Sequence, residues 1–501
     1  MIVSMRRQTA ILLAVLLALV GLAGSPAGTQ QGDLSPVTAI VSLTGSASAT
    51  ALRGVRVVSE LPSFGMVVVT GTADALRSLR GRAGVRGVTP DYQLAPTAKD
   101  ASPGSGSLFA GDHLNGLVAT DGAGAGVTVA VVDTGISDTP ALNRASGRLH
   151  DGINTSGIAS FADGYGHGTF MANLVAGGRA PGSGSHTLGV APAASVVNVK
   201  VAGSTGNTSL VQVLAAFSWI DYFADRIDIV EFAYSGARPG AAYGPDPLTD
   251  AIERMRASGI LSVVSSGNVS GQLGDPGFDP YALTVGAADV RPGTGREVAG
   301  FSGYGNVYGV VKPDVVASGV GLLSLLPVDS LVAAQNPQSL QPNGLYRGSG
   351  TSHASAITAG LAATVLQRFP DATPGDVKAT LRSTARNISG TGSGQGLVSV
   401  PEQLYRADGD QRRNAGTGEE DLDQAAWLAN SWLDGAWLED TAASWSAASW
   451  SAASWSAASW SAGSWSAASW SAASWSAASW SAASWSAASW SAASWSARSW
   501  S

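Results

Sequence analysis

Three short segments of the sequence carry residues that can attack a carbonyl group or move a proton. Asp133 directly follows the apolar run Val127–Val132. His167 stands between two glycines at the start of one apolar stretch, and Ser352 stands at the start of another. A serine can attack, a histidine can take its proton, and a carboxylate can orient the histidine. Taken singly, each residue also has an ordinary explanation as a turn residue, a helix start or a helix N-cap.

Alternating strands and helices are expected to position these side chains. Near-continuous apolar runs bounded by glycine or polar residues are typical of strands covered on both faces, as in a parallel sheet. Such runs occupy 127–132, 195–201, 227–230 and 259–264, with helices expected near 167–177, 208–224, 247–258 and 352–368. The pattern predicts one α/β domain over 115–400. Asp133 then lies at the carboxyl end of a strand, where open α/β sheets place their sites.

The order of these segments and their flanking residues resemble the subtilisin family of serine peptidases. The shared motifs are Val-Val-Asp-Thr-Gly at 131–135, His-Gly-Thr at 167–169 and Gly-Thr-Ser at 350–352. A fourth is Ser-Ser-Gly-Asn at 265–268, where the family keeps the asparagine of its oxyanion hole. The resemblance covers residues 120–400 and implies a three-layer subtilisin-like domain with a mostly parallel central sheet.

The resemblance implies a role for each matching residue. Ser352 is the expected nucleophile, His167 the general base, and Asp133 the group that orients His167. The Asn268 side chain and the Ser352 backbone N–H are the expected donors to the oxyanion. An extended substrate is expected to pair with exposed backbone edges at the loop 203–207 and at Ala233, Tyr234, Ser235 and Gly236. The implied activity is hydrolysis of protein or peptide substrates through an acyl-enzyme, with no cofactor required.

Two departures from the family pattern bear on this expectation. His353 follows the candidate nucleophile where the family usually has methionine, and it either perturbs the nucleophile or packs inertly. The segment Glu231–Gly236 replaces the family's common Asn-Met-Ser-Leu-Gly, which puts specificity in question more than activity.

The asparagine-rich calcium loop of some relatives is replaced by glycine and serine near 181–187, so no metal site is predicted and calcium has no recognisable site.

Residues 1–27 have the pattern of a secretory signal peptide. Arg6 and Arg7 precede an apolar run over 10–23, and Ser25-Pro26-Ala27 is a small-x-small cleavage site. The alternative is a membrane anchor, but the run of 14 residues is short for a span of about 20. The expected location is therefore outside the cell.

A small α+β unit is predicted over residues 35–95. Strand-like runs occupy 37–43, 55–58, 66–70 and 85–88, and a helical stretch lies near 72–79. The unit resembles the subtilisin prodomain, which assists folding, blocks the cleft with its C-terminal tail and is removed autocatalytically. The alternative is an unrelated small domain.

The composition excludes several other functions. The chain has 501 residues, no cysteine, and 29 Lys and Arg against 36 Asp and Glu. The absence of cysteine removes disulfide frameworks, thiolate zinc sites and cysteine nucleophiles. The net charge of −7 argues against a nucleic-acid partner. Seven acids between 419 and 440 account for the whole excess, in and after a polar, acidic linker over 405–425.

Residues 426–501 form a repeat in which tryptophan recurs at every fifth position from Trp445 to Trp500. Successive indoles would lie 140° apart around a helix and on alternate faces of a strand, so neither gives a single stripe. A disordered tail, a four-sided solenoid and another assembly all stay open. The functional hypotheses are attachment to glycans of the cell envelope, self-association, or a spacer without a ligand. The competing view of the whole protein is a catalytically silent subtilisin fold that binds through this tail.

Overall fold

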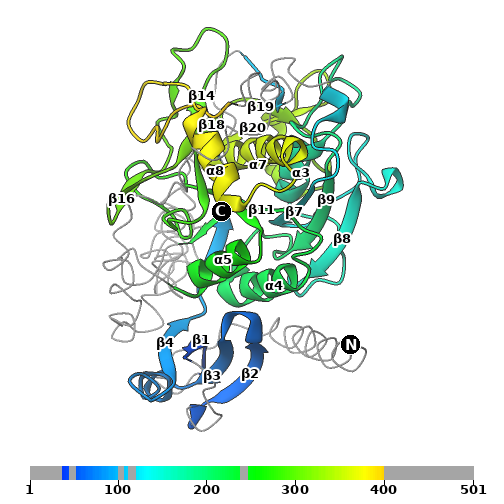
Figure 1. The fold of residues 1–501 in the computed structure, drawn as a ribbon. Helices are drawn as coiled ribbons and strands as arrows, with labels where there is room; N and C mark the ends of the chain where they lie inside the picture. The colour runs from blue at the N-terminus through cyan, green and yellow to red at the C-terminus, as the bar shows by residue number, and fades with distance from the viewer. Residues whose placement is uncertain (1–35, 45–51, 100–105, 111–119, 237–245, 400–501) are drawn as a thin grey trace, which may run out of the picture.

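The computed structural model describes residues 36–44, 52–99, 106–110, 120–236 and 246–399. The predicted signal peptide, acidic linker and tryptophan repeat therefore lie outside the described residues. The described chain forms a small N-terminal unit, residues 36–99, and a larger α/β domain (Figure 1). Within the described ranges, no helix is both long and apolar enough to cross a membrane.

A sheet of eight strands forms the centre of the larger domain. Its strand order is β15-β14-β13-β11-β7-β9-β8, with β18 also beside β14. All neighbours are parallel except β15, which runs antiparallel to β14. The mostly parallel sheet predicted from the sequence is thus confirmed. The strands are β7 (Thr128–Asp133), β8 (Leu149–Asn154), β9 (Ser195–Lys200), β11 (Ile229–Phe232), β13 (Leu261–Ser265), β14 (Leu283–Asp289), β15 (Glu297–Val298) and β18 (Val315–Ser318).

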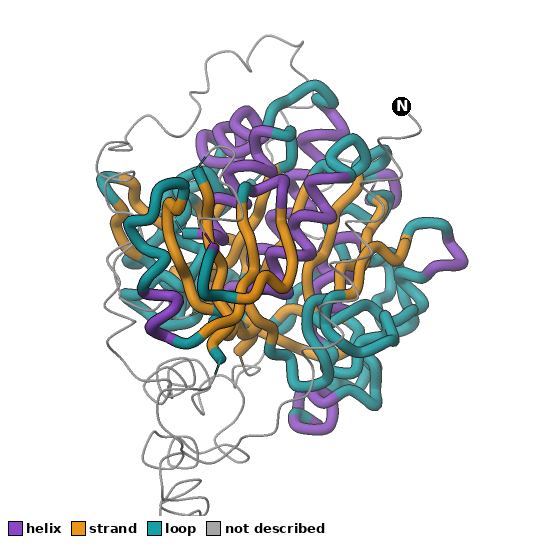
Figure 2. Tube along the Cα trace, turned by 90° about the horizontal axis from the view of Figure 1, so that it is seen from below, coloured by secondary structure: helices purple, strands orange, loops and turns teal. Residues whose placement is uncertain are grey.

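Helices cover both faces of this sheet (Figures 1 and 2). One layer contains α3 (His167–Ala176), α7 (Thr351–Arg368) and α8 (Pro374–Ser383), and the other contains α4 (Leu210–Tyr222) and α5 (Pro247–Ala257). Successive strand residues point to opposite layers: Val129 and Val131 pack with α3 and α7, whereas Ala130 and Val132 pack with α4. Because both sets are buried, the strands read as continuous apolar runs.

The N-terminal unit is a four-stranded antiparallel sheet of order β2-β3-β1-β4 with one short helix. Alternate residues again face opposite ways. Val41 and Val69 pack with Leu76 of the unit's own helix, while Ile40 and Val68 share a core cluster with α4 and α5. The elements are β1 (Val37–Leu43), β2 (Arg56–Leu61), β3 (Met66–Gly71), α2 (Ala73–Arg77) and β4 (Val85–Pro90), close to the predicted runs.

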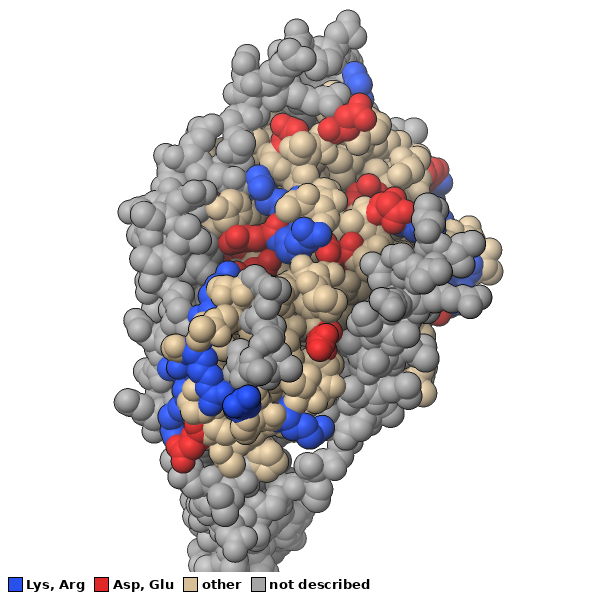
Figure 3. Space-filling model, turned by 60° about the horizontal axis from the view of Figure 1, so that its bottom comes forward, with Lys and Arg blue, Asp and Glu red and all other residues tan. Residues whose placement is uncertain are grey.

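Opposite charges meet where the N-terminal unit lies on the larger domain. Arg86 of β4 forms an ion pair with Asp250 in the first turn of α5, and Glu253 of the same helix adds to the attraction. Viewed from this side, basic side chains gather over one part of the surface and acidic ones over another (Figure 3). The contact between the two parts is therefore apolar at its centre and charged at its edge.

The N-terminal unit ends in an extended tail. β5 (Gln93–Pro96) runs antiparallel between β10 (Thr208–Ser209) and β12 (Tyr234–Gly236). β6 (Ala98–Lys99) then joins β20 (Tyr346–Gly350), whose other neighbour is β19 (Leu322–Ser324). The remaining elements are β16 (Gly305–Val307), β17 (Val310–Lys312) and α6 (Leu331–Gln335), with short 3-10 turns between some elements.

Candidate active site

Asp133 and His167 meet where β7 ends and α3 begins. His167 Nδ1 lies 2.9 and 2.8 Å from the two Asp133 carboxylate oxygens, and both side chains are buried. The Thr134 backbone N–H also donates to Asp133 Oδ1 at 2.7 Å. A Cβ on Gly168 would lie 2.3 Å from the Gly135 carbonyl oxygen, so only glycine lets the helix start approach the strand end this closely. The glycines beside His167 therefore have a steric reason.

Asp163 ties the start of α3 to the end of β7. Its buried carboxylate accepts from Gly166 N at 2.6 Å, Thr169 N at 2.8 Å and Thr134 Oγ1 at 2.8 Å. Thr134 Oγ1 in turn accepts from Gly168 N at 2.9 Å. Burial raises the pKa of Asp163, and these hydrogen bonds oppose the rise. The network fixes the start of α3 against the end of β7, and so holds the His167 ring with Nδ1 toward the Asp133 carboxylate.

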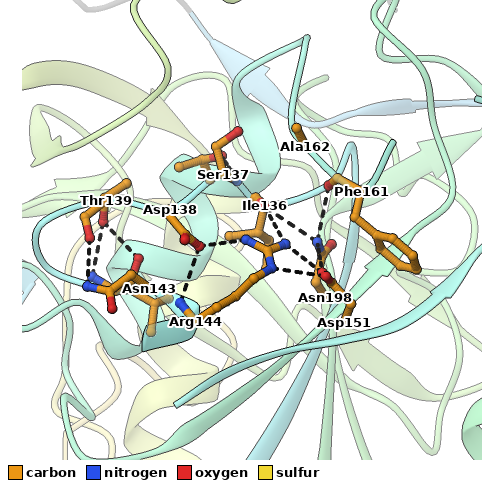
Figure 4. A network of polar contacts seen from close by, with 12 residues as sticks. Ile136, Ser137, Asp138, Thr139, Asn143, Arg144, Asp151, Phe161, Ala162 and Asn198 are labelled. Carbon is orange, nitrogen blue, oxygen red and sulfur yellow. Dashed lines mark hydrogen bonds and ion pairs between the residues drawn. The ribbon is translucent and has the colours of Figure 1, made fainter. Parts of the chain in front are cut away.

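A second polar network holds the loops around this pair (Figure 4). Arg144 lies 2.6 Å from Asp138 and 2.5 Å from Asp151, and its hydrogen bonds to Asp151 raise the pKa of the guanidinium. Asn198, on β9, donates to Asp151 at 3.1 Å and to the Phe161 carbonyl at 3.2 Å. The loop after β7 and the loop before α3 are thereby fixed to β8 and β9.

Ser352 and Asn268 come together at the start of α7. Ser352 lies in the first turn of that helix and is fully buried. Asn268, just after β13, accepts from Thr351 N at 3.0 Å and from Thr351 Oγ1 at 2.9 Å through Oδ1. Its amide Nδ2 therefore points the other way, as a donor. Among the described residues, His167 Nε2 has no hydrogen-bond partner.

The protein's own chain occupies the space between these donors. The Thr97 carbonyl oxygen accepts from Asn268 Nδ2 at 2.6 Å, from Ser352 Oγ at 2.9 Å and from Ser352 N at 3.3 Å. A Cβ on Gly350 would lie 2.4 Å from this oxygen, so the glycine leaves room for it. Sequence reasoning missed Thr97, because the residue has no motif of its own. The Pro, Lys, Asp, Ser and Gly residues of 96–110 indicated an exposed linker and a cleavage zone there, but Thr97 is buried.

The extended backbone that leads to Thr97 pairs along both of its edges. On one side, Ser235 pairs with Ala95, and the Thr97 N–H donates to the Ala233 carbonyl at 2.9 Å. These are the edge residues expected from the sequence. On the other side the partner is β10, Thr208–Ser209, rather than the expected loop 203–207. The loop is engaged elsewhere, since the Tyr234 hydroxyl donates to the Gly206 carbonyl at 2.9 Å.

His353 contacts the candidate nucleophile. Its Nδ1 lies 3.2 Å from Ser352 Oγ, and its ring packs edge-on against Phe170. Burial and the neighbouring His167 hold the pKa of His353 well below its usual range, so the ring stays neutral at pH 7. The ring also lines a hollow beside Ala98. The ring is therefore both packed under the helix and in contact with the candidate nucleophile.

Glu231 lies beneath α7, not along the substrate edge. Its Oε1 accepts from Ser355 Oγ at 2.7 Å, while Oε2 has no hydrogen-bond partner in the described chain. Burial, and then the charge of Asp133, raise the pKa of Glu231 well above its ordinary value. Burial therefore favours the protonated form of this side chain, which supports the first turn of α7 through Ser355. Of the changed segment, Tyr234, Ser235 and Gly236 pair with β5, and the Ala233 carbonyl accepts from Thr97 N.

The described residues contain no group of three or more His, Asp or Glu side chains that is arranged to hold a metal ion.

Comparisons with known proteins agree with this geometry. The model of the subtilase family matches residues 124–419. Serine protease AprX of Bacillus subtilis is 36% identical over 330 residues, which cover 62% of this chain and 72% of AprX. Subtilisin Savinase of Lederbergia lenta is 32% identical over 291 residues, covering 58% of this chain and 92% of Savinase.

A solved structure shows the same fold. Fervidolysin from Fervidobacterium pennivorans, a keratinolytic enzyme related to subtilisin, superposes with a TM-score of 0.59 at 23% identity. The match covers 76% of this chain and 62% of fervidolysin. With the family model, the relatives and the arrangement around Ser352 in agreement, this chain belongs to the subtilase family and is a serine endopeptidase.

Proposed function

We propose that the protein is made as an inhibited precursor and cleaves its own Thr97–Ala98 peptide bond, with Ser352, His167 and Asp133 as its catalytic triad. The observation that carries this proposal is the Thr97 carbonyl oxygen, which accepts hydrogen bonds from Asn268 Nδ2 and from both the Oγ and the N of Ser352. A carbonyl held against a nucleophile by two oxyanion donors is arranged for acyl transfer.

The reaction follows from these contacts. The Ser352 hydroxyl turns its proton from the Thr97 carbonyl to His167 Nε2, which has no other partner in the described chain. Ser352 Oγ then bonds to the carbonyl carbon, and the oxyanion is held by Asn268 Nδ2 and Ser352 N. His167 returns the proton to the Ala98 nitrogen as the C–N bond breaks. Water, activated by the same histidine, hydrolyses the acyl-enzyme.

The N-terminal unit acts as the inhibitor because its tail fills the substrate position. Two side chains anchor that tail. The Tyr92 hydroxyl hydrogen-bonds to Asp275, and Asp91 accepts from Val211 N at 3.0 Å in the first turn of α4. After cleavage, β5 would still occupy both backbone edges, so other substrates enter only once the unit leaves.

The test compares the full chain with its Ser352→Ala variant, each expressed alone and purified. We expect the native chain to yield a product whose first residue is Ala98, as read by N-terminal sequencing and intact mass. Ser352→Ala should stay joined at this bond. Equal cleavage of both chains, or a Ser352-dependent cut at another bond, would contradict the proposal.

Export and attachment complete the proposal. Residues 1–27 direct export, and residues 426–501 attach the enzyme to cell-envelope glycan through repeated indole faces. The test of attachment is a chain without 426–501, compared with the full chain for retention on purified cell walls. Equal retention of the two chains would exclude the attachment role. A catalytically silent binding protein, the competing view, is disfavoured because every chemistry-bearing residue of the site is present.

A further inference from the structure

The side chain of Thr97 contacts two buried polar groups. Its Oγ1 lies 2.9 Å from the Ala233 carbonyl oxygen and 2.8 Å from Ser265 Oγ. Thr97 is only 4% exposed, and Ala233 and Ser265 are fully buried. The residue before the proposed scissile bond is thus held by its hydroxyl group as well as by its backbone.

The two contacts use the proton of the hydroxyl group and one of its lone pairs. A threonine hydroxyl has one proton to donate and two lone pairs to accept with. The carbonyl of Ala233 can only accept, so Thr97 donates to it and accepts the proton of Ser265. Each of the three groups then has a partner, in a place where water has no access.

Ser265 is a fixed group that faces the substrate position. It is the last residue of β13, which lies inside the parallel sheet between β11 and β14. In the described part of the chain, Thr97 is the partner that the structure gives the Ser265 hydroxyl. Because a sheet interior keeps this hydroxyl in place, the group is available to read the side chain of each substrate in turn.

We infer that Ser265 is a specificity-determining residue, and that the enzyme selects threonine or serine immediately before the scissile bond. The inference rests on the proposed function, which makes Thr97 the first substrate residue. Valine has the shape of threonine but leaves the Ser265 hydroxyl buried and unpaired, which is costly. Leucine and phenylalanine likewise have no hydroxyl group for the Ala233 carbonyl or for Ser265, so we expect both to be disfavoured.

The test measures kcat/KM of the self-cleaved enzyme on quenched fluorescent peptides with the sequence of residues 93–99. The residue before the cut is threonine, serine, valine, alanine or leucine. We expect threonine to exceed valine by about tenfold to a hundredfold, the range for one buried hydrogen bond left unmade. In Ser265→Ala this ratio should fall to near one, while alanine is still cleaved.

The matched control is Ser266→Ala. Ser266 is the next residue, also fully buried, and its hydroxyl has no hydrogen-bond partner among the described residues. We expect Ser266→Ala to keep the preference for threonine over valine. A loss of the preference in both variants would assign it to general loosening of the strand end, which would overturn the role of Ser265.

A second readout uses the full chain. Thr97→Val should slow self-cleavage, Thr97→Ser should not, and Thr97→Val should add no further loss in the Ser265→Ala background. Ser352-dependent cleavage with equal rates for threonine and valine would overturn this inference alone. Absence of any Ser352-dependent cleavage would overturn the proposed function together with it.

Discussion

Asn268→Ala should slow catalysis strongly without changing substrate binding. In the native chain, Asn268 Nδ2 donates to the Thr97 carbonyl oxygen at 2.6 Å, the shorter of the two amide contacts to that oxygen. The charge on this oxygen grows in the transition state, so the contact stabilises the transition state more than the bound substrate. The variant keeps the Ser352 N–H, at 3.3 Å, as the remaining oxyanion donor.

The size of the loss follows from the number of donors removed. Losing one preorganised oxyanion donor typically costs about 3 kcal/mol, or 10²–10³ in rate. We therefore expect self-cleavage of the precursor, and kcat of the mature enzyme on peptides, to fall by about this factor, with KM nearly unchanged. Self-cleavage is measured as a first-order rate by gel or mass spectrometry, and kcat by continuous fluorescence.

Thr351→Val tests the positioning of the Asn268 amide separately from its donation to the oxyanion. The Thr351 hydroxyl donates to Asn268 Oδ1 at 2.9 Å, and its loss leaves the backbone N–H to orient the amide. We expect a loss of no more than about tenfold, the size of one ordinary hydrogen bond. Thermal unfolding of each variant checks the fold.

If Asn268→Ala kept kcat within threefold of the native value, or lost activity through KM alone, the oxyanion role would be refuted.

Three further predictions concern buried acids. Glu231→Gln should keep activity and become more stable than the native chain as pH rises above 4.5, the ordinary pKa of a glutamate side chain. The reason is that the folded-state pKa of Glu231 is raised, so its ionisation opposes folding. Urea unfolding against pH, in a Ser352→Ala background, checks this prediction. Burial raises the pKa of Asp91 from 3.8 to about 6, so inhibition by the released N-terminal unit should weaken as pH rises, by about two powers of ten in all from below 3.8 to above 6. The measurement is the inhibition constant against pH, and Asp91→Asn should remove most of this dependence. Asp314→Ala leaves Lys312, 2.7 Å away, buried without its carboxylate, and should destabilise the fold by about 3–5 kcal/mol in urea unfolding; a cost below about 1 kcal/mol would show that the pair is not strongly coupled.

Much of the fold was predictable from local patterns. The apolar runs at 127–132 and 195–201 predicted β7 and β9 to within a residue or two, because a strand buried on both faces needs apolar residues at nearly every position. The helix starts at His167 and Thr351 were marked by glycine and polar residues. The predicted α+β pattern before residue 96 also appears as strands and a helix.

The surroundings of the site were less predictable. His353 was visible as a departure, but its contact with Ser352 depends on the direction of a ring in the first turn of α7. Glu231 was visible only as part of the changed segment 231–236, and nothing in the sequence showed where its side chain points. The Glu231 side chain bonds to Ser355 of α7, whereas Ala233 contacts the chain at Thr97 through its backbone carbonyl.

The sequence by itself determined the elements, the parallel sheet and which residues can carry the chemistry, since these depend on residue types and short spacings. Only the tertiary structure decided which peptide bond meets Ser352. Thr97 and Ser352 are 255 positions apart, and their contact depends on the register of β5 between β10 and β12. That register depends on anchors such as Tyr92 on Asp275, which come from distant parts of the chain. No local pattern records such a pairing, because its free energy exists only when the two parts are packed together.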